Sequence, residues 1–411
     1  MSPVHVNSEI GQLEAVLVHT PGEELTAVTP SNREDYLYDD IIGLEIAQRE
    51  HRRLVSVMSR FCEVHEISDL LAETIAQPEA REFLITKTLD VVPSEPLAAR
   101  LNALPPQGIV HKLIEGEEEE VGPLARALNE VGFTLPPLPN LFFPRDIGIV
   151  VGEHVVVGSM RYGVRWTEEL LIKTLFRFNQ RLANAGILYD GSEERRNNYT
   201  LEGGDVHVLR PDLLVCGFSE RTSPAALDQL CDVVFQQTAV TDVIVVVMPK
   251  APTAIHLDMV FTQVDRELCT VFSPFFAGPE RLPVLHRRKG LDAVREMPNF
   301  FAALRAVNLP MEPIFAGGGH RSTQEREQWA SACNFLAVRP GTIISYRRNE
   351  VTLEELQKAG FRVVSATDFL AFPDDWLDTK HRTAITIEGD ELVRGGGGPR
   401  CMTLPVRRAD P

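Results

Sequence analysis

The stretch LEGGDVHVLRPDLLVCGFS at residues 201–219 decides the fold of this chain. It places a polar residue, Asp205, at the head of an alternating apolar strand, which the turn RPD connects to a second apolar strand. Alternation with a period of two, bounded by turn residues, is typical of a β-hairpin. The sequence therefore predicts a hairpin with a carboxylate at its head.

Three other stretches repeat this pattern of a polar head, a strand, a turn and a returning strand. Their heads are Asp146, Asp258 and Asn334. A helical pattern and a further apolar strand (ILYD, VIVVVMP, EPIFAG or RVVSA) follow each of the four hairpins, which gives a ββαβ unit. The three stretches are FPRDIGIVVGEHVVVGS (143–159), HLDMVFTQVDRELCTVFS (256–273) and CNFLAVRPGTIISYRRN (333–349).

The two ends of the chain supply the strands of one further unit. They are LEAVLVHTPG (13–22) and CMTLPVRR (401–408). Units this short cannot bury their faces alone and must pack side by side. We therefore expect an α/β fold, a five-fold pseudo-symmetric α/β propeller of ββαβ units, with the polar heads converging on its axis.

The region from residue 68 to 135 departs from this pattern. It is helical and acidic, it shows no hairpins, and it is followed by the proline-rich LPPLPN. We interpret 68–135 as a helical insertion domain, and 1–67 together with 136–411 as the catalytic propeller domain. The run GEEEEV at 116–121 predicts a solvated face.

The composition limits which partners and which cellular location fit this protein. The 411 residues are 44% apolar, with 41 basic and 58 acidic side chains, and this charge of −17 disfavours nucleic acid and anionic membranes as partners. No apolar run is long enough to cross a bilayer, and the N-terminal residues do not resemble a signal peptide. The six cysteines form no CxxC pair, which favours a reducing, cytoplasmic location over a disulfide scaffold or a cysteine zinc site. The sequence does not decide the oligomeric state, and a homo-oligomer is possible.

If the units converge, their heads form one cluster of side chains that could take part in a reaction. It combines carboxylates (Asp146, Glu202, Asp205, Asp258) with His256 and Cys401. Carboxylates accept hydrogen bonds bidentately from a guanidinium group, so the cluster suits a guanidino substrate. They also raise the pKa of a neighbouring thiol, so an arriving cation would favour the thiolate.

The run GGGGPRCMT at 395–403 places Cys401 directly behind four glycines. Such a run disfavours helix and strand, so one interpretation is a mobile loop that gates the site and whose glycines need positive φ. The alternative is a surface connector beside an inert buried cysteine.

Several motifs together resemble the arginine deiminases of the guanidino-group-modifying (pentein) superfamily, almost from end to end. The resemblance implies hydrolysis of L-arginine to L-citrulline and ammonia without a metal or another cofactor, and a helical insertion that marks the family. The motifs are PPLPNLFFPRD (136–146), MRYGVRWTEELL (160–171), TLEGGD (200–205), GFSERTS (217–223), HLDMVF (256–261), EREQW (325–329) and GGGGPRCMTLPVRR (395–408).

Carried over by motif, the resemblance also implies residue roles. Cys401 would attack the guanidinium carbon to give a covalent thiouronium, and His256 would protonate the departing ammonia and then activate water. Asp146 and Asp258 would hold the guanidinium nitrogens, with Glu202 near His256. The implied substrate-binding residues are Asn140, Phe143, Arg165, Arg221 and Arg400; of these, Asn140, Arg165 and Arg221 would bind the amino-acid end, and Arg400 lies beside the nucleophile.

Three positions depart from the family pattern. Pro144 and Met259 stand where many relatives have Thr, and we expect modest effects from both. Gly396 stands where some relatives carry an arginine that closes onto the substrate, so that closing contact is missing here.

Other functions fit parts of the pattern. His256 and the carboxylates could bind Zn²⁺ or Mn²⁺, although no second His has ligand spacing and a metal would make Cys401 redundant. An amidinotransferase would use the same Cys and His, a deiminase could act on agmatine or another guanidine, and a regulatory protein could bind arginine without turnover.

Overall fold

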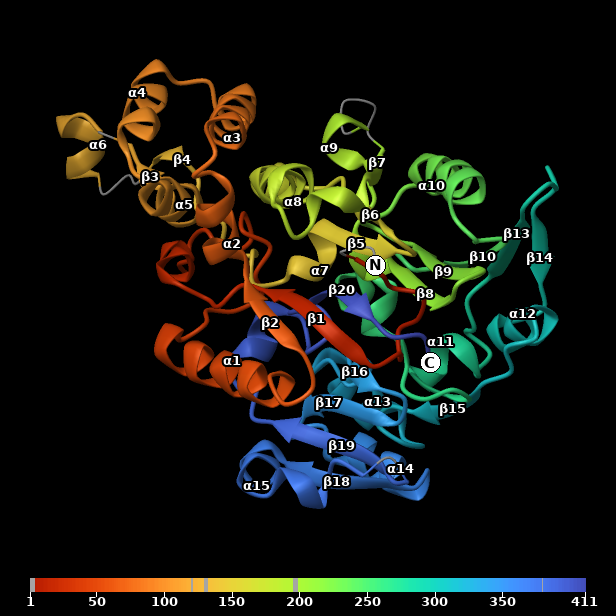
Figure 1. The fold of residues 1–411 in the computed structure, drawn as a ribbon. Helices are drawn as coiled ribbons and strands as arrows, with labels where there is room; N and C mark the ends of the chain where they lie inside the picture. The colour runs from red at the N-terminus through yellow and green to blue at the C-terminus, as the bar shows by residue number, and fades with distance from the viewer. Residues whose placement is uncertain (1–3, 120, 129–131, 195–198, 379) are drawn as a thin grey trace.

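The computed structural model describes residues 4–119, 121–128, 132–194, 199–378 and 380–411 of the chain, which adopts a mixed α/β fold (Figure 1). Its described strands form one five-stranded, one four-stranded, three three-stranded and one two-stranded sheet. Helices such as α1, α10 and α12 lie at the periphery, and both chain ends lie near the middle (Figure 1).

All four predicted hairpins are confirmed. In each, two antiparallel strands follow the polar head, joined by the turn that the sequence predicts. The pairs are β5 (Gly148–Val151) with β6 (His154–Val157), β8 (Val206–Arg210) with β9 (Leu213–Phe218), β11 (Phe261–Gln263) with β12 (Leu268–Val271), and β16 (Leu336–Arg339) with β17 (Thr342–Tyr346).

In the first three units a helix returns the chain so that a third strand pairs in parallel with the second strand of the hairpin, as predicted. Unit 1 continues with α8 (Trp166–Phe178) and β7 (Ile187–Asp190), unit 2 with α10 (Pro224–Gln237) and β10 (Asp242–Val247), and unit 3 with α12 (Phe300–Ala306) and β15 (Glu312–Phe315).

The fourth unit differs from its prediction in strand order. We expected RVVSA to return beside the hairpin. It does form β18 (Phe361–Ser365) after α14 (Glu350–Lys358), but β19 (Arg382–Ile387) lies between β17 and β18. The burial of the two strands gives the reason: β19 is buried along nearly its whole length, as a central strand must be, whereas β18 is only half-buried and suits the edge.

The fifth unit is built from both ends of the chain, as predicted. The first long strand, β1 (Leu13–Val18), pairs antiparallel with the last, β20 (Leu404–Arg408). After α1 (Leu44–Met58), β2 (Glu63–Glu66) pairs in parallel with β1 and completes the unit.

Neighbouring units share their hydrophobic cores. Ile149 and Val156 of unit 1 pack in one cluster with Val208 and Leu214 of unit 2. Further clusters combine strand residues of units 2 and 3, of units 3 and 4, and of units 4 and 5. A last cluster combines unit 5, through Leu404, with unit 1. Each unit therefore completes its core against two others.

The structure contains one hairpin that the sequence did not predict. The strands β13 (Val284–Arg288) and β14 (Arg295–Met297) extend the sheet of unit 2 beyond β10, and they lie at the rim of the molecule (Figure 1). Their charged sequence, LHRRKG, hides the alternation that marks the other hairpins.

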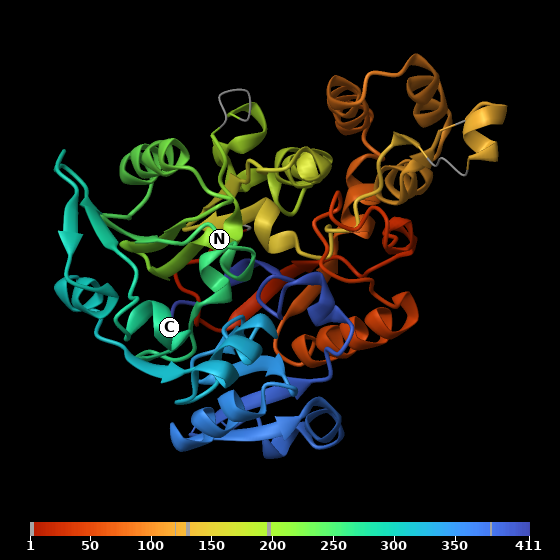
Figure 2. The ribbon, with the colours of Figure 1, turned by 180° about the vertical axis from the view of Figure 1, so that it is seen from behind.

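The described residues of 67–135, which are 67–119, 121–128 and 132–135, form a group of helices to one side of the sheets, as both views show (Figures 1 and 2). The expectation of no hairpin is wrong at its end, where the short strands β3 and β4 pair antiparallel. Leucines of these helices share a core cluster with those of α8, so the group is packed against unit 1. Its elements are α2 (Ile67–Thr74), α3 (Pro78–Val91), α4 (Glu95–Ala103), α5 (Pro106–Glu115), β3 (Glu117–Glu118), α6 (Pro123–Ala127) and β4 (Phe133–Leu135).

Short helical turns occupy the heads of the hairpins and position the side chains discussed below. They are α7 (Pro144–Ile147), η5 (Gly203–Asp205) and η7 (Leu257–Met259), with η2 (Gly163–Arg165) before α8 and η9 (Leu392–Gly395) before the glycines. The other helices are η1 (Glu23–Ala27), η3 (Ala183–Ala185), α9 (Gly191–Glu194), η6 (Pro252–Ala254), α11 (Ser273–Phe276), α13 (Arg321–Trp329), α15 (Ala366–Ala371) and η8 (Pro373–Asp375). In the part of the chain that the structure describes, every helix is too short or too polar to traverse a lipid bilayer.

Candidate active site

The heads of different units meet at a single buried site around Cys401. The two glycines of LEGGD allow this close approach: a Cβ on Gly203 would lie 2.1 Å from the carbonyl oxygen of Arg145, and one on Gly204 would lie 2.7 Å from the ring of His256. Larger residues at these positions would force the heads apart. Asp205, in contrast, faces away from the cavity, because its carboxylate accepts hydrogen bonds from Ser219 Oγ and from the backbone N–H of Leu257.

His256 lies between two carboxylates. Its Nε2 is 2.7 Å from Glu202 Oε2, and its Nδ1 is 3.6 Å from Asp146 Oδ1. Burial alone would lower the pKa of His256, but Asp146 and Glu202 outweigh it and raise the pKa to about 9. Burial likewise opposes ionisation of Glu202, but Arg221 and His256 prevail and lower its pKa to about 2. The imidazole is therefore protonated at neutral pH and can act as an acid.

Cys401 is a buried free thiol next to a carboxylate. Only 5% of its surface is exposed, and its Sγ lies 3.5 Å from Asp258 Oδ2. Burial first, and then the charges of Asp258 and Asp146, raise the pKa of the thiol well above its usual range. The thiol is thus neutral until a positive charge enters the site.

Asp146 and Asp258 each keep one oxygen without a partner. An arginine binds the other oxygen: Arg165 Nη1 is 2.6 Å from Asp146 Oδ2, and Arg400 Nη1 is 2.8 Å from Asp258 Oδ2. The remaining Oδ1 atoms are buried and have no hydrogen-bond partner among the described residues. Two acceptor oxygens are therefore available beside Cys401, which is what a group rich in N–H donors requires.

The two arginines expected at the amino-acid end differ in how far their donors are used. Arg165 donates through Nε, Nη1 and Nη2, to Glu168, Asp146 and the carbonyl oxygens of Asn140 and Phe143. Among the described residues, the guanidinium of Arg221 donates a hydrogen bond to Glu202 alone, at 3.3 Å, and its buried Nε has no hydrogen-bond partner. Arg221 therefore has donors free for a ligand, whereas those of Arg165 are engaged.

A small inner cavity of about 30 Å³ borders the thiol. A water molecule occupies about 30 Å³ in the liquid, so an arginine side chain needs more room than the cavity offers as it stands. Seven predicted site residues line it together with glycines of the run at 395–397. Its described lining is Leu37, Asn140, Phe143, Asp146, Arg165, Arg221, Ile255, His256, Met259, Gly395, Gly396, Gly397 and Cys401.

Arg400 lies behind the cavity and is not part of its described lining. Its guanidinium group is fully buried and forms a fork with Glu9, at 3.1 and 3.0 Å, while Nη1 reaches Asp258. Arg400 thus connects the N-terminal segment to Asp258. Contact between Arg400 and a substrate stays a prediction.

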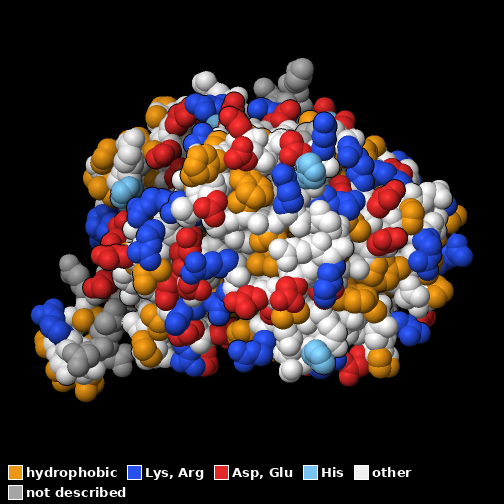
Figure 3. Space-filling view, turned by 90° about the horizontal axis from the view of Figure 1, so that it is seen from below, with side chains coloured by type: hydrophobic (Ala, Val, Ile, Leu, Met, Phe, Trp, Pro, Cys, Tyr) orange, Lys and Arg blue, Asp and Glu red, His pale blue; other side chains and the backbone are white. Residues whose placement is uncertain are grey.

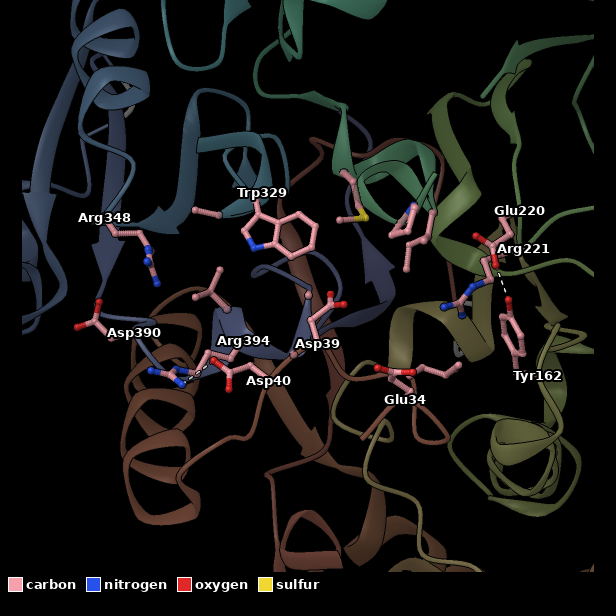
Figure 4. A pocket seen from close by; sticks show the side chains of 18 residues that line it. Glu34, Asp39, Asp40, Tyr162, Glu220, Arg221, Trp329, Arg348, Asp390 and Arg394 are labelled. Carbon is pink, nitrogen blue, oxygen red and sulfur yellow. Dashed lines mark hydrogen bonds and ion pairs between the residues drawn. The ribbon is translucent and has the colours of Figure 1, made fainter. Parts of the chain in front are cut away.

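An outer cavity of about 610 Å³ adjoins the inner one and shares Leu37, Arg221 and Gly396 with it. Figure 4 shows its charged lining, with Tyr162, Glu220 and Arg221 grouped on one side. The Tyr162 hydroxyl donates to Glu220, and the Tyr162 ring lies 4.8 Å from the Arg221 guanidinium carbon. The outer cavity is therefore a charged route that ends at Arg221.

The glycine run covers the inner cavity. Gly396 has a φ of +83°, as expected for a loop glycine, and has open space around it. Gly397 has no positive φ, so the expectation that the glycines need positive φ is wrong at this position. A side chain is disfavoured there for another reason, because a Cβ on Gly397 would lie 2.5 Å from the Phe143 ring. The hydroxyl of Tyr346 donates to the Gly397 carbonyl oxygen at 3.0 Å and fixes one end of the run. Gly396 has room for a side chain, while its backbone N–H donates to the Val393 carbonyl oxygen at 2.9 Å.

A metal ion would find one candidate set of ligands among the described residues. One ligand atom from each of Asp146, Glu202 and His256 lies within 4.8 Å of the others. The same atoms form the 2.7 Å contact between His256 and Glu202, which a bound ion would have to break. The ligand atoms of His256 and Glu202 are therefore already bonded to each other.

Three residues that contact the site were not selected from the sequence. Glu168 binds Arg165, Glu9 binds Arg400, and Asn334 contacts Cys401. Asn334 carried a usable signal, because it heads a repeated hairpin as the selected aspartates do. Glu168 carried one as well, because it lies three residues after Arg165 at the start of a predicted helix. Glu9 carried none in a single sequence.

A family model and named relatives both match this chain over most of its length. The family model for arginine deiminase matches residues 34–408. Proteins named arginine deiminase from Rhodococcus jostii strain RHA1 and Staphylococcus aureus strain Newman are each 32% identical to this chain over 99% of its length, and 98% and 99% of their own lengths are covered.

Solved structures resemble the fold at low sequence identity. An amidinotransferase of saxitoxin biosynthesis from Microseira wollei aligns with a TM-score of 0.56 and 13% identity, covering 100% of this chain and 98% of that one. DDAH from Pseudomonas aeruginosa, complexed with citrulline, aligns with a TM-score of 0.52 and 12% identity, covering 96% and 99%. These likenesses concern the fold.

Proposed function

The chain belongs to the arginine deiminase family, and on that premise we propose that it hydrolyses L-arginine to L-citrulline and ammonia through a covalent intermediate on Cys401. One observation carries the proposal: two buried carboxylates, Asp146 and Asp258, each keep an unbonded oxygen next to a buried free thiol. A guanidinium group offers planar N–H donors and a positive charge, and so suits both the oxygens and the thiol.

The chemistry follows from the positions of Cys401 and His256. The thiolate attacks the guanidinium carbon and forms a C–S bond, and the C–N bond to the terminal nitrogen breaks. That nitrogen leaves as ammonia with a proton from His256, which leaves a thiouronium on Cys401. His256 then accepts one proton from water as the water attacks the same carbon. The remaining hydroxyl proton passes to solvent as the C–S bond breaks, which releases citrulline and the thiolate.

The substrate also supplies the charge that activates its own nucleophile. Asp258 and Asp146 hold the pKa of the Cys401 thiol high in the free enzyme. A guanidinium bound by these two carboxylates compensates their charge and lowers that pKa. Glu202 keeps His256 protonated for the first step.

The amino-acid end of the substrate points toward the outer cavity in this proposal. Arg221 takes the α-carboxylate, because it has unused donors and lines both cavities. Asn140, Phe143 and Arg165 line the inner cavity and contribute to the wall around the substrate. Arg400 acts through Asp258.

For the architecture, we propose the five-fold propeller with 1–67 and 136–411 as the catalytic domain and 68–135 as the insertion. The pairwise sharing of cores supports a closed ring, because unit 5 shares one cluster with unit 1 and another with unit 4. The helical content of the group from α2 to α6 supports the insertion.

The setting we propose is cytoplasmic, with arginine as the ligand and no nucleic acid or membrane partner. Six free cysteines favour a reducing compartment. Figure 3 shows one face of the molecule, on which basic and acidic side chains are interspersed, unlike a nucleic-acid-binding surface. A homo-oligomer is compatible with these features.

A citrulline assay with purified protein and arginine as the sole substrate tests the proposal. Citrulline and ammonia should form in equal amounts, and a chelator should have no effect. Ammonia formation that requires an added amine would indicate an amidinotransferase, and equal efficiency with agmatine would indicate another guanidine as substrate. Binding of arginine without citrulline would contradict catalysis altogether.

A further inference from the structure

Asn334 heads the hairpin of unit 4. Both polar atoms of its side chain, Oδ1 and Nδ2, contact Cys401, and Nδ2 also contacts Asp258. Oδ1 accepts from the backbone N–H of Cys401 at 3.0 Å. Nδ2 lies 3.0 Å from Cys401 Sγ and 3.2 Å from the carbonyl oxygen of Asp258. The side chain is fully buried.

The orientation of this amide is fixed by its partners. The Cys401 N–H can only donate and the Asp258 carbonyl can only accept, so the oxygen of the amide must face the first and the nitrogen the second. The second proton of Nδ2 is then directed at the sulfur. A flip of the amide would lose these contacts, so the N–H toward Sγ follows from the network.

The heads of the hairpins support the same conclusion independently. Three of the four repeated heads are carboxylates (Asp146, Asp205 and Asp258), and only Asn334, which lies 3.0 Å from the sulfur, is an amide. A carboxylate at 334 would still accept from the Cys401 N–H, but it would place a negative charge beside the thiolate. The amide keeps the acceptor and replaces that charge with a donor.

We propose that Asn334 is a further catalytic residue, whose amide N–H stabilises the Cys401 thiolate, both before attack and when the sulfur leaves the intermediate. The proposal rests on the proposed function, because it takes Cys401 as the nucleophile. Asn334 offsets the carboxylates that face the sulfur.

The other groups around Cys401 define what a measurement must separate. Asp258 and Asp146 disfavour the thiolate, whereas Arg400 and the backbone N–H of Gly398 favour it. His256 lines the same cavity, and the Tyr346 hydroxyl donates to the nearby Gly397 carbonyl oxygen. None of these groups changes in an Asn334 variant, so a shift in thiol reactivity reports on the amide.

The test is the pH dependence of Cys401 alkylation by iodoacetamide, in the absence of arginine, for Asn334→Ala and Asn334→Asp. Because a hydrogen bond to a charged group is worth about one to two powers of ten, the thiolate titration should move up by about 1 to 2 pH units, and kcat should fall about 10- to 100-fold. The matched control is Asn349→Asp, a buried asparagine of the same unit that donates to the Ala330 carbonyl oxygen. Its alkylation profile should equal that of the unmutated enzyme.

The outcomes separate the proposal from its alternatives. An unchanged alkylation profile in Asn334→Ala would overturn it, even if kcat falls, because Asn334 would then serve structure alone. A shift in Asn334→Asp without one in Asn334→Ala would also overturn it, since the new charge would be the cause. If the Ala variant does not fold, Asn334→Leu, which also removes the amide N–H without adding a charge, decides by the presence or absence of the shift. Alkylation needs no turnover, so absence of citrulline in the unmutated protein would refute the proposed function without deciding this point.

Discussion

Replacing Glu202 with Gln should move the alkaline limit of activity. The Nε2 of His256 lies 2.7 Å from Glu202 Oε2, and burial of His256 is outweighed by Asp146 and Glu202, which raise its pKa to about 9. Unit charges about 4 Å apart at an effective dielectric constant of about 20 interact by roughly 4 kcal/mol, or about 3 pH units. The amide retains a hydrogen bond and Asp146 remains, so we expect the pKa of His256 to fall by about 2 units.

The direction of the effect follows from the role of His256 as an acid. Its protonated form delivers the proton to ammonia, so activity persists up to the folded pKa of about 9 and is lost above it. In Glu202→Gln the alkaline limb of the kcat/KM profile should therefore lie near pH 7. The same pair links pH to folding: the contribution of His256 to stability is complete below its unfolded pKa of about 6.5 and disappears as pH rises through 9, and the variant should lack most of it.

The assay is the initial rate of citrulline formation between pH 5 and 10. A lower rate at all pH values could come from the lost contact between Glu202 and Arg221, so the position of the limb is the decisive quantity. Asp242→Asn is the matched control, because Asp242 holds His286 at the same 2.7 Å in the sheet of unit 2. If the limb of Glu202→Gln stays where it is in the unmutated enzyme, Glu202 does not set the protonation of His256 and the reasoning fails.

Three other substitutions test separate parts of the site. Cys401→Ser should form no citrulline yet bind arginine in calorimetry, since both carboxylates remain; a covalent adduct in its mass spectrum would contradict the mechanism. Gly397→Ala should lower kcat about tenfold with little change in melting temperature, because the new Cβ displaces the Phe143 ring at 2.5 Å, whereas Gly319→Ala, with open space around it, should be silent. Glu9→Ala should lower the free energy of unfolding by about 3 to 5 kcal/mol, measured in urea, because it leaves the buried Arg400 without its fork; a loss below 1 kcal/mol would refute that assignment.

The repeated hairpins could be predicted because their alternation is local. A strand with one buried face records that burial in every second residue, and the turns GEH, RPD and RPG mark where the chain reverses. The order of β18 and β19 could not be predicted, because both are short apolar strands and their order depends on which packs better in the centre. The hairpin of β13 and β14 was missed for a related reason, since its exposed position removes the apolar pattern.

The partners of the site residues were harder to predict than the residues themselves. Cys401, His256 and the two aspartates are unusual enough at repeated positions to be selected from the sequence. Glu9 and Arg400, however, are 391 residues apart, and nothing in the local sequence of either records the pairing. Arg165 was expected to bind the amino-acid end of the substrate, yet its donors bind Glu168, three residues along the chain, and Asp146, which lies 19 residues away.

These hidden partners explain how the site can keep carboxylates buried beside a thiol. A buried carboxylate without a counter-charge is strongly destabilising, and two of them beside Cys401 would repel each other as well. Arg165 and Arg400 each compensate one carboxylate, those of Asp146 and Asp258, and leave the second oxygen without a hydrogen bond. Since part of the charge is already compensated, total charge alone cannot select the incoming cation; it must fit both oxygens at once, and a planar guanidinium does so where an ammonium cannot.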